Sequence, residues 1–233
     1  MSDSEREKLA QRLALVRERI EEACRRAGRD PASVTLVAVT KSVSIERAAD
    51  VAELGVSDLA ENRPQELWRK RSALPAARWH VIGHLQRNKI PQTLPVHLVH
   101  SVDSLRLITA LEAEGARRKM CVPVLLQVNV SGESTKQGLA LHQLFQVCDQ
   151  AQAFTAVRIT GLMTMAPFEA EPERCRPFFR GLRELAETWS NRLEQPHDLA
   201  ILSMGMSQDY TVAIEEGATM VRIGSALFAE NSA

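Results

Sequence analysis

Lys41 is the residue whose type and position most clearly indicate chemistry. It follows VTLVAVT (34–40), a β-branched and largely apolar run that is typical of a strand buried on both faces. A lysine at the end of such a strand faces the mouth of a barrel, where burial and a nearby cation such as Arg222 would lower the pKa of its amine. A neutral amine can attack an aldehyde and form a Schiff base. The alternative interpretation is a lysine that simply extends into solvent.

Small and hydroxyl-bearing residues stand at the carboxyl ends of the last two predicted strands. They form the segments SMGMS (203–207) and Gly224–Ser225. Such residues are also common in helix caps and turns. However, the usual phosphate site of an α/β barrel lies after strands seven and eight. There, backbone N–H groups, hydroxyls and a helix N-terminus favour a phosphate dianion. Together with Lys41, this pattern predicts a ligand with an aldehyde and a phosphate, such as pyridoxal 5′-phosphate (PLP).

Eight strand-like runs and intervening helix-like segments must position these residues. The strands are predicted at 34–40, 56–60, 79–82, 97–102, 122–130, 157–165, 199–204 and 219–223. The helices are predicted at 4–27, 44–54, 62–72, 86–92, 103–118, 139–153, 171–193 and 206–216. Strict alternation of this kind indicates the α/β class and permits either a closed barrel or an open doubly wound sheet.

The count of eight favours a single (β/α)8 TIM-type barrel with an extra N-terminal helix. We therefore predict one PLP-binding barrel domain over 1–233, with residues 1–30 packed on the barrel as that helix. A Rossmann-like sheet is the alternative. It would require a glycine-rich segment after the first strand, where the sequence instead has KSVS.

Several helix boundaries are also predicted from residue types. Ser44 and Asp103 stand where N-caps belong, and Gly55, Gly115 and Gly217 stand where helices should stop.

Charge gives no indication of a nucleic-acid or membrane partner. Lys+Arg and Asp+Glu both total 29, so the formal net charge is zero. The basic excess in 63–89 lacks the interleaved aromatic residues of a stacking surface, and we interpret it as a solvated helix face. We interpret the carboxylates Glu215 and Glu216 as solvated too.

The cysteines and the N-terminus indicate a soluble, cytoplasmic protein. The sequence has four cysteines, none in a C-x-x-C pair, and neither an apolar signal segment nor a membrane-spanning run. His80 and His84 are four residues apart, but they straddle a strand end and a glycine. They therefore lack the helical geometry of a zinc pair, and no metal site is predicted.

Seven segments resemble, in order, those of the pyridoxal phosphate homeostasis protein family. They are LVAVTK (36–41), ENRPQE (61–66), WHVIGHLQRNK (79–89), QVNVSGESTKQG (127–138), GLMTMAPF (161–168), LSMGMSQDY (202–210) and VRIGSALF (221–228). The resemblance implies a barrel of the alanine racemase N-terminal-domain type. Two residues depart from the family pattern: Ala60 stands where glycine is usual, and Ser225 where threonine is frequent.

The resemblance also implies roles for individual residues. Lys41 would carry PLP as a Schiff base, and Arg222 would face the pyridine nitrogen. The phosphate would be held by Ser203, Gly224 and Ser225. Asn62 and His84 would line the ring pocket.

The sequence favours a carrier over an enzyme. An arginine against the pyridine nitrogen would keep that nitrogen unprotonated, which makes the ring a poor electron sink. Alanine racemases also take a second base, a tyrosine, from a further domain of a partner subunit. Here the sequence ends at Ala233, shortly after the last predicted strand, and its one tyrosine, Tyr210, is expected to cap or pack beside the phosphate site.

We therefore predict a monomeric, non-catalytic protein that holds PLP on Lys41 and buffers or delivers it in intracellular vitamin B6 homeostasis. PLP-dependent apo-enzymes are the expected recipients. Two alternatives remain open. One is a racemase-like PLP enzyme that uses His84 or another lysine as second base, and the other is a barrel enzyme whose Lys41 forms a Schiff base with a phosphorylated sugar.

Overall fold

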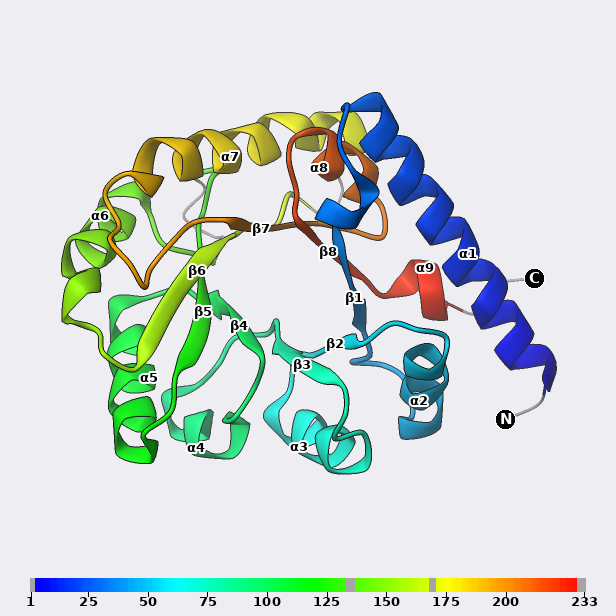
Figure 1. Ribbon diagram of the computed structural model, residues 1–233, viewed down its shortest axis with the longest axis horizontal. Coiled ribbons are helices and arrows are strands. Elements are labelled where there is room, and N and C mark those ends of the chain that lie inside the picture. The colour runs from blue at the N-terminus through cyan, green and yellow to red at the C-terminus, as the bar shows by residue number, and fades with distance from the viewer. Residues whose placement is uncertain (1–2, 133–136, 168–170, 230–233) are drawn as a thin grey trace.

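The fold is a closed barrel of eight parallel strands in the order β1 to β8 (Figure 1). The computed structural model describes residues 3–132, 137–167 and 171–229, so parts of the motif segments 127–138 and 161–168 lie outside the described residues. The strands are β1 (Thr35–Val39), β2 (Asp58–Glu61), β3 (Arg78–Val81), β4 (Leu98–Val102), β5 (Val122–Gln127), β6 (Val157–Met163), β7 (Ile201–Met206) and β8 (Met220–Ile223). The predicted barrel is confirmed.

Pairing between the first and last strands closes the sheet. Val37 of β1 is in register with Asp58 of β2 on one side and with Arg222 of β8 on the other. In an open Rossmann-like sheet each of the two edge strands would have a neighbour on one side only, so the pairing of β1 with β8 excludes that fold.

Helices surround the barrel on its outer side (Figure 1). They are α1 (Asp3–Arg26), α2 (Ile45–Glu53), α3 (Pro64–Ala73), α4 (Ile90–Thr93), α5 (Leu105–Arg118), α6 (Leu141–Gln150), α7 (Arg176–Ser190), α8 (Tyr210–Glu215) and α9 (Ser225–Phe228). Within the described residues, no helix has the length and apolar character needed to cross a membrane.

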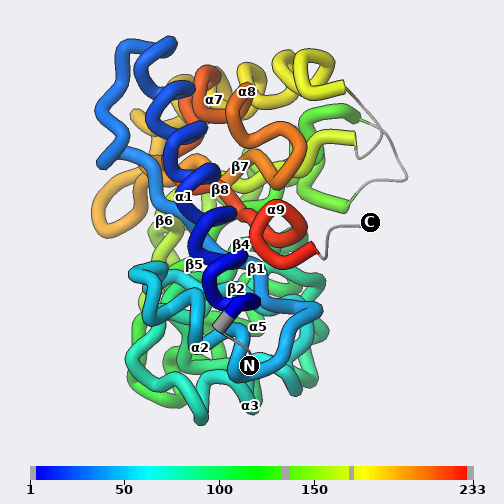
Figure 2. The backbone as a smooth tube through the Cα atoms, turned by 90° about the vertical axis from the view of Figure 1, so that its right-hand side faces the viewer, coloured from blue at the N-terminus to red at the C-terminus, as the bar shows by residue number. Residues whose placement is uncertain are grey.

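The predicted N-terminal helix is present as α1. Its apolar stripe is buried, and it is formed by Leu9, Leu13, Val16 and Ile20. The stripe packs α1 against α8 and α9 on the outside of the barrel (Figure 2).

Three helix-boundary predictions are confirmed and two are wrong. Gly55 and Gly217, both with positive φ, directly follow the C-caps of α2 and α8. Ser44 caps α2 by accepting a hydrogen bond from the Arg47 N–H. The N-cap of α5 is Ser104 rather than Asp103, because the Ser104 hydroxyl accepts from the Leu107 N–H. Gly115 lies inside α5 and does not end it.

Close packing of α5 explains Gly115. A Cβ atom at this position would come within 2.9 Å of Ala156 and Val122 side-chain atoms, so only glycine lets the helix approach the strands this closely.

The barrel interior is only partly apolar. Most buried hydrophobic side chains lie in one large cluster, and a second, smaller cluster consists of Val37, Val39, Ala60, Leu98, Leu125, Met163 and Met220. On the same strands, two residues before or after members of this cluster, stand buried polar residues such as Asp58, His100 and Arg222. Because side chains alternate along a strand, these polar residues face the interior as well.

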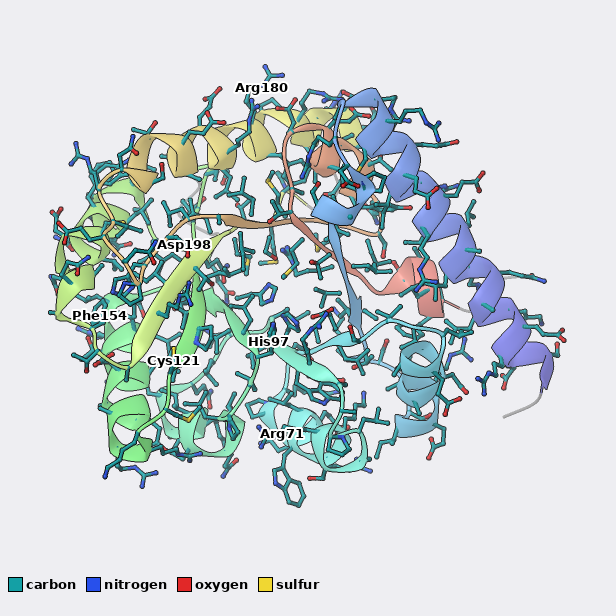
Figure 3. The ribbon with its side chains drawn as sticks, viewed as in Figure 1. Arg71, His97, Cys121, Phe154, Arg180 and Asp198 are labelled. Atoms are coloured by element: carbon teal, nitrogen blue, oxygen red, sulfur yellow. The ribbon has the colours of Figure 1, made fainter. Side chains whose placement is uncertain are left out.

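Two predictions of solvated charge are wrong. Lys70 belongs to the basic stretch assigned to an exposed helix face, yet only 2% of its surface is exposed. Glu216 is 5% exposed and lies within 4.0 Å of three arginines of α7, namely Arg176, Arg180 and Arg183. Arg180 is labelled on the outer surface of α7 in Figure 3. These ion pairs link α7 to the end of α8.

Candidate functional site

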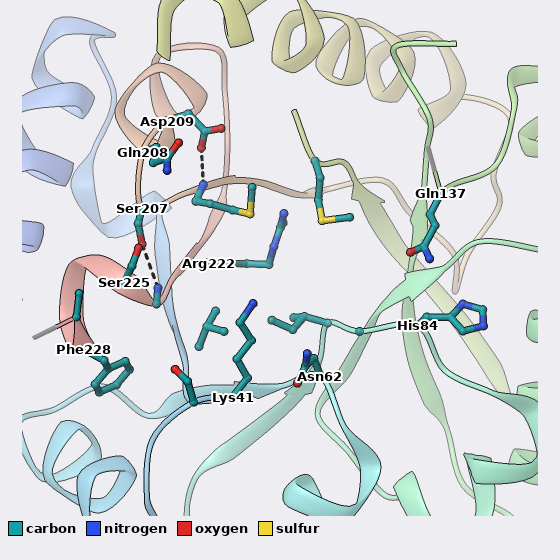
Figure 4. Close-up of a pocket in the computed structure, with 18 of the residues that line it drawn as sticks. Lys41, Asn62, His84, Gln137, Ser207, Gln208, Asp209, Arg222, Ser225 and Phe228 are labelled. Atoms are coloured by element: carbon teal, nitrogen blue, oxygen red, sulfur yellow. Dashed lines mark hydrogen bonds between the residues drawn. The ribbon is translucent and has the colours of Figure 1, made fainter. Parts of the chain in front are cut away.

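A cavity of about 740 Å³ lies where the carboxyl ends of the strands meet, as expected for a barrel of this type (Figure 4). Six of the seven predicted site residues line it: Lys41, Asn62, His84, Arg222, Gly224 and Ser225. The seventh, Ser203, does not. It is fully buried below the cavity, inside the barrel.

Lys41 extends from the end of β1 into this cavity (Figure 4). Its surface is exposed, so the burial expected from the sequence is not found. An exposed amine at the pocket mouth is accessible to a ligand that enters from solvent.

A buried ion pair supports the chain segment that carries Lys41. The Lys70 ammonium donates hydrogen bonds of 2.6 Å to the Glu61 carboxylate and 2.6 Å to the carbonyl oxygen of Thr40. The Thr40 hydroxyl donates to the same Glu61 oxygen at 2.7 Å. These bonds tie the ends of β1 and β2 to α3, immediately before Lys41.

Arg222 enters the cavity from β8, and its guanidinium is fixed from below. It donates 2.7 Å and 3.0 Å hydrogen bonds to the Ser203 hydroxyl and to the carbonyl oxygen of Thr164. Burial lowers the pKa of Arg222 to about 10, whereas the nearby Asp209 carboxylate raises it. Arg222 therefore remains charged at neutral pH.

Ser207 occupies the position at the pocket wall that the sequence analysis gave to Ser203. Its hydroxyl accepts hydrogen bonds from the backbone N–H groups of Gly224 at 3.2 Å and Ala226 at 3.1 Å (Figure 4). We define Ser207, Gly224 and Ser225 as the serine-glycine cup. The helices α8 and α9 that follow the two strands have only six and four residues, so their macrodipoles are small.

Gly205 lies within β7, two residues before Ser207, where the register between β7 and β8 shifts. Its φ is +91°, and a Cβ atom there would lie 2.6 Å from that of Ala213. A larger residue would be strained and would also push α8 away from β7.

Asn62 and His84 lie on the other side of the cavity from the cup (Figure 4). Gly83 allows the two loops to meet, because a Cβ atom there would lie 2.4 Å from the Asn62 carbonyl oxygen. The His84 side chain is 54% exposed, and its Nδ1 lies 3.1 Å from the Asp103 carboxylate. In Figure 4 its imidazole points away from Lys41 and Arg222.

Other residues of the cavity were not singled out as ligand contacts from the sequence. Gln127 of β5 reaches it although only 3% of its surface is exposed, and Met165 and Met206 add apolar surface. No residue pattern around Gln127 indicates that its side chain faces a ligand cavity. Met163 and Met204, in contrast, are fully buried.

The residues present fit PLP by the chemistry of their side chains. One cavity brings together a lysine amine, an arginine that has only donors to offer, and a cup with the hydroxyls of Ser207 and Ser225. These groups match an aldehyde, a pyridine nitrogen and a phosphate, respectively.

The fold and the site define a (β/α)8-barrel protein with a lysine from β1 and an arginine from β8 in one pocket. Residues 12–232 match the family model described as "Alanine racemase, N-terminal domain". The chain belongs to the pyridoxal phosphate homeostasis protein family.

Three relatives of that name illustrate the match. The protein of Aquifex aeolicus is 40% identical over 225 residues, which cover 94% of this chain and 97% of the relative. The protein of Pseudomonas aeruginosa is 39% identical over 223 residues, 94% of each chain. That of Escherichia coli K12 is 34% identical over 228 residues, 94% of this chain and 95% of the relative.

Solved structures show the same fold. PipY of Synechococcus elongatus, described with PLP bound, has a TM-score of 0.83 and 31% identity over 95% of this chain and all of PipY. An unknown protein from Bifidobacterium adolescentis has a TM-score of 0.91 and 32% identity over 98% of this chain and 97% of that chain. Alanine racemase of Clostridium difficile, at 13% identity and a TM-score of 0.76, shares the barrel fold. The match covers 97% of this chain and 61% of the racemase chain.

Proposed function

We propose that this protein holds PLP reversibly on Lys41 and serves PLP homeostasis, buffering the cofactor or delivering it to apo-enzymes. The observation that carries the proposal is the meeting of Lys41, Arg222 and the serine-glycine cup in one cavity. Relatives of similar length are named pyridoxal phosphate homeostasis proteins, and PipY is described with PLP bound.

Each part of the cavity has a task in this proposal. PLP would supply an aldehyde, and the Lys41 amine is the group that would hold it covalently. The cup, with Ser207 in the place first assigned to Ser203, binds the phosphate. Arg222 donates toward the pyridine nitrogen, while Asn62 and Gln127 line the space for the ring.

The geometry favours binding over catalysis. Arg222 is charged at neutral pH and fixed by two hydrogen bonds, so it keeps a hydrogen-bond donor at the ring nitrogen and disfavours a proton there. Tyr210 is 2% exposed, packed in the protein core, so its hydroxyl is not presented as a second base.

The protein is further proposed to act as one barrel domain, as a monomer, in the cytoplasm. Cys24, Cys121 and Cys148 are free thiols, and Cys24 and Cys148 are buried. Free thiols are typical of a reducing compartment.

Absorption spectroscopy tests the binding proposal. Purified protein mixed with PLP should become yellow, and borohydride reduction should attach the label permanently to the peptide that contains Lys41. Lys41→Ala should lose both signals, whereas Lys89→Ala, which changes a lysine outside the cavity, should keep them. A label on another lysine, or a colourless wild-type protein, would refute the proposal.

Proton exchange tests the absence of catalysis. The PLP-loaded protein is incubated with L- and D-alanine in deuterated water, and deuterium at the α-carbon is measured by NMR. We expect no more exchange than free PLP produces at the same concentration. Sustained exchange with turnover would establish the racemase-like alternative.

A further inference from the structure

A row of buried polar side chains runs through the barrel interior below Arg222. Its members, each from a different strand and at most 5% exposed, are Asp58 (β2), His80 (β3), His100 (β4), Ser203 (β7) and Arg222 (β8). Asp58 is the first residue of β2 and so lies at the end of the barrel opposite the cavity. We name these five residues the interior row.

Every neighbouring pair in the interior row is within hydrogen-bond distance. The Arg222 guanidinium lies 2.7 Å from the Ser203 hydroxyl, which lies 2.9 Å from Nδ1 of His100. Nε2 of His100 lies 2.9 Å from Nδ1 of His80. Finally, Nε2 of His80 lies 3.0 Å from the Asp58 carboxylate.

The Asp58 carboxylate sets the direction of the row. Burial alone would raise the pKa of Asp58, but hydrogen bonds from Arg78 and His80 hold it well below its usual range. Arg78 donates to both carboxylate oxygens. An ionised carboxylate can only accept, so Nε2 of His80 must carry a hydrogen and donate it.

If His80 is neutral, this hydrogen on its Nε2 determines where the other hydrogens of the row lie. Its Nδ1 is then an acceptor, so His100 must donate to it from Nε2. Burial is the largest cause that lowers the pKa of His100 well below its usual range, and the Arg222 charge lowers it further, so His100 is neutral. Its Nδ1 accepts from the Ser203 hydroxyl, whose oxygen accepts from Arg222. All four bonds are thus donated toward Asp58.

A proton on Nδ1 of His80 would reverse the direction of the two hydrogen bonds that His100 makes. His80 would donate to His100, and His100 would donate to the Ser203 oxygen, which already accepts from Arg222. The Ser203 hydrogen would then have no acceptor within the row. Arg78, which pairs with Asp58, also brings positive charge close to this position, whereas the Asp58 carboxylate itself attracts a proton to His80. Only a neutral His80 gives every bridging hydrogen of the row an acceptor within it.

Two members of the row, Asp58 and His80, could instead bind a metal ion together with His97. Asp58, His80 and His97 offer ligand atoms within 4.8 Å of one another. His97 is labelled near the middle of the barrel, beside β3, in Figure 3. However, Arg78 already holds both oxygens of Asp58, and its positive charge opposes a cation there. The hydrogen-bonded row is thus the better account of these residues.

We propose that Asp58 is a positioning residue for the ligand pocket, holding Arg222 in place through Ser203, His100 and His80 from the opposite end of the barrel. The role rests on the proposed function only in that Arg222 faces the PLP ring. The hydrogen positions within the interior row do not depend on any ligand.

Nitrogen-15 NMR of the ligand-free wild-type protein tests the row itself. At pH 7.5 both His80 and His100 should carry their hydrogen on Nε2, with Nδ1 unprotonated. A hydrogen on Nδ1 of either residue would overturn the inference. Wild-type protein with these tautomers that does not bind PLP would instead refute the proposed function and leave the row intact.

Asp58→Asn tests the positioning role, because the amide keeps the shape of Asp58 and removes its charge. PLP should dissociate about fivefold faster, the equivalent of one net hydrogen bond, and its absorption maximum should shift. Asp198→Asn is the matched control, because Asp198 pairs with Arg158 outside the row. Equal dissociation rates and spectra in the two variants would overturn the role. Ser203→Ala, which breaks the row at its other end, replaces Asp58→Asn if that variant does not fold.

Discussion

Ser203 and Ser207 are four residues apart and have different surroundings. Ser203 faces the barrel interior and accepts a hydrogen bond from Arg222, whereas Ser207 lines the cavity and accepts from two backbone N–H groups. The predicted strand ended at residue 204, but β7 continues to Met206. Ser203 therefore lies in the middle of β7 rather than at its end, and Ser207 directly follows the strand at the rim where a phosphate can reach it.

Ser207→Ala should therefore weaken PLP binding by about tenfold or more, the value of a hydrogen bond to a charged group. Pyridoxal, which lacks the phosphate, is the control ligand, and its affinity should change little. Fluorescence titration of the variant with both ligands measures the difference. Equal losses for PLP and pyridoxal would place Ser207 away from the phosphate.

At the scale of elements, the ends of β1 and β2 depend on the buried Lys70–Glu61 pair. Lys70 donates to Oε1 of Glu61 and to the Thr40 carbonyl oxygen, whereas Oε2 of Glu61 has no hydrogen-bond partner among the described residues. This ion pair was not predictable from local sequence. Lys70 of α3 is buried because its partners lie at the ends of β1 and β2, which are distant from it along the chain. Helical spacing alone cannot distinguish such a lysine from a solvated one.

Glu61→Ala should lower the free energy of unfolding by about 3–5 kcal/mol, because it leaves the Lys70 charge buried without a partner. The double variant Glu61→Leu with Lys70→Met should recover much of that loss, since it removes both charges. Urea unfolding measures the effect. Glu66→Ala, which removes an exposed ion pair with Arg69, is the control and should cost less than about 1 kcal/mol. A similar small cost for Glu61→Ala would show that the pair carries little stability.

The strands were predictable and their ends less so. Most of the eight strands are β-branched or apolar runs between polar segments, and that pattern is visible in the sequence, although β2 (DLAE) and β3 (RWHV) are half polar. The structure moves several boundaries by one to three residues, and it places Gly115 inside α5. Lys41 and Arg222 were accessible to prediction because they stand next to or within such runs. The interior row was not, because it joins residues from five strands by side-chain bonds alone.

At the scale of the whole molecule, buried histidines make stability depend on pH. Burial is the largest cause that lowers the pKa of His100 and His197. The unfolded chain titrates these groups near pH 6.5, so below that pH it binds more protons than the folded protein. Stability from these groups is therefore complete above about pH 6.5 and is lost as the pH falls. Asp58, whose pKa is lowered as well, adds a loss of the same sign below about pH 4.

The urea midpoint should accordingly be lower at pH 5 than at pH 7.5. His100→Gln should reduce this difference between the two pH values, because it removes a buried imidazole. His142→Gln, at an exposed position on α6, is the control and should leave the difference unchanged. Equal or greater stability of the wild-type protein at pH 5 would contradict the prediction.

The closure of the barrel between β1 and β8 has a further consequence for the order of events during synthesis. Lys41 leaves the ribosome before Arg222 and before the Gly224–Ser225 part of the cup. The two halves of the pocket meet only when β8 pairs with β1. A nascent chain therefore cannot hold the ligand with its full set of contacts, and retention of the ligand marks a polypeptide whose last strand is in place.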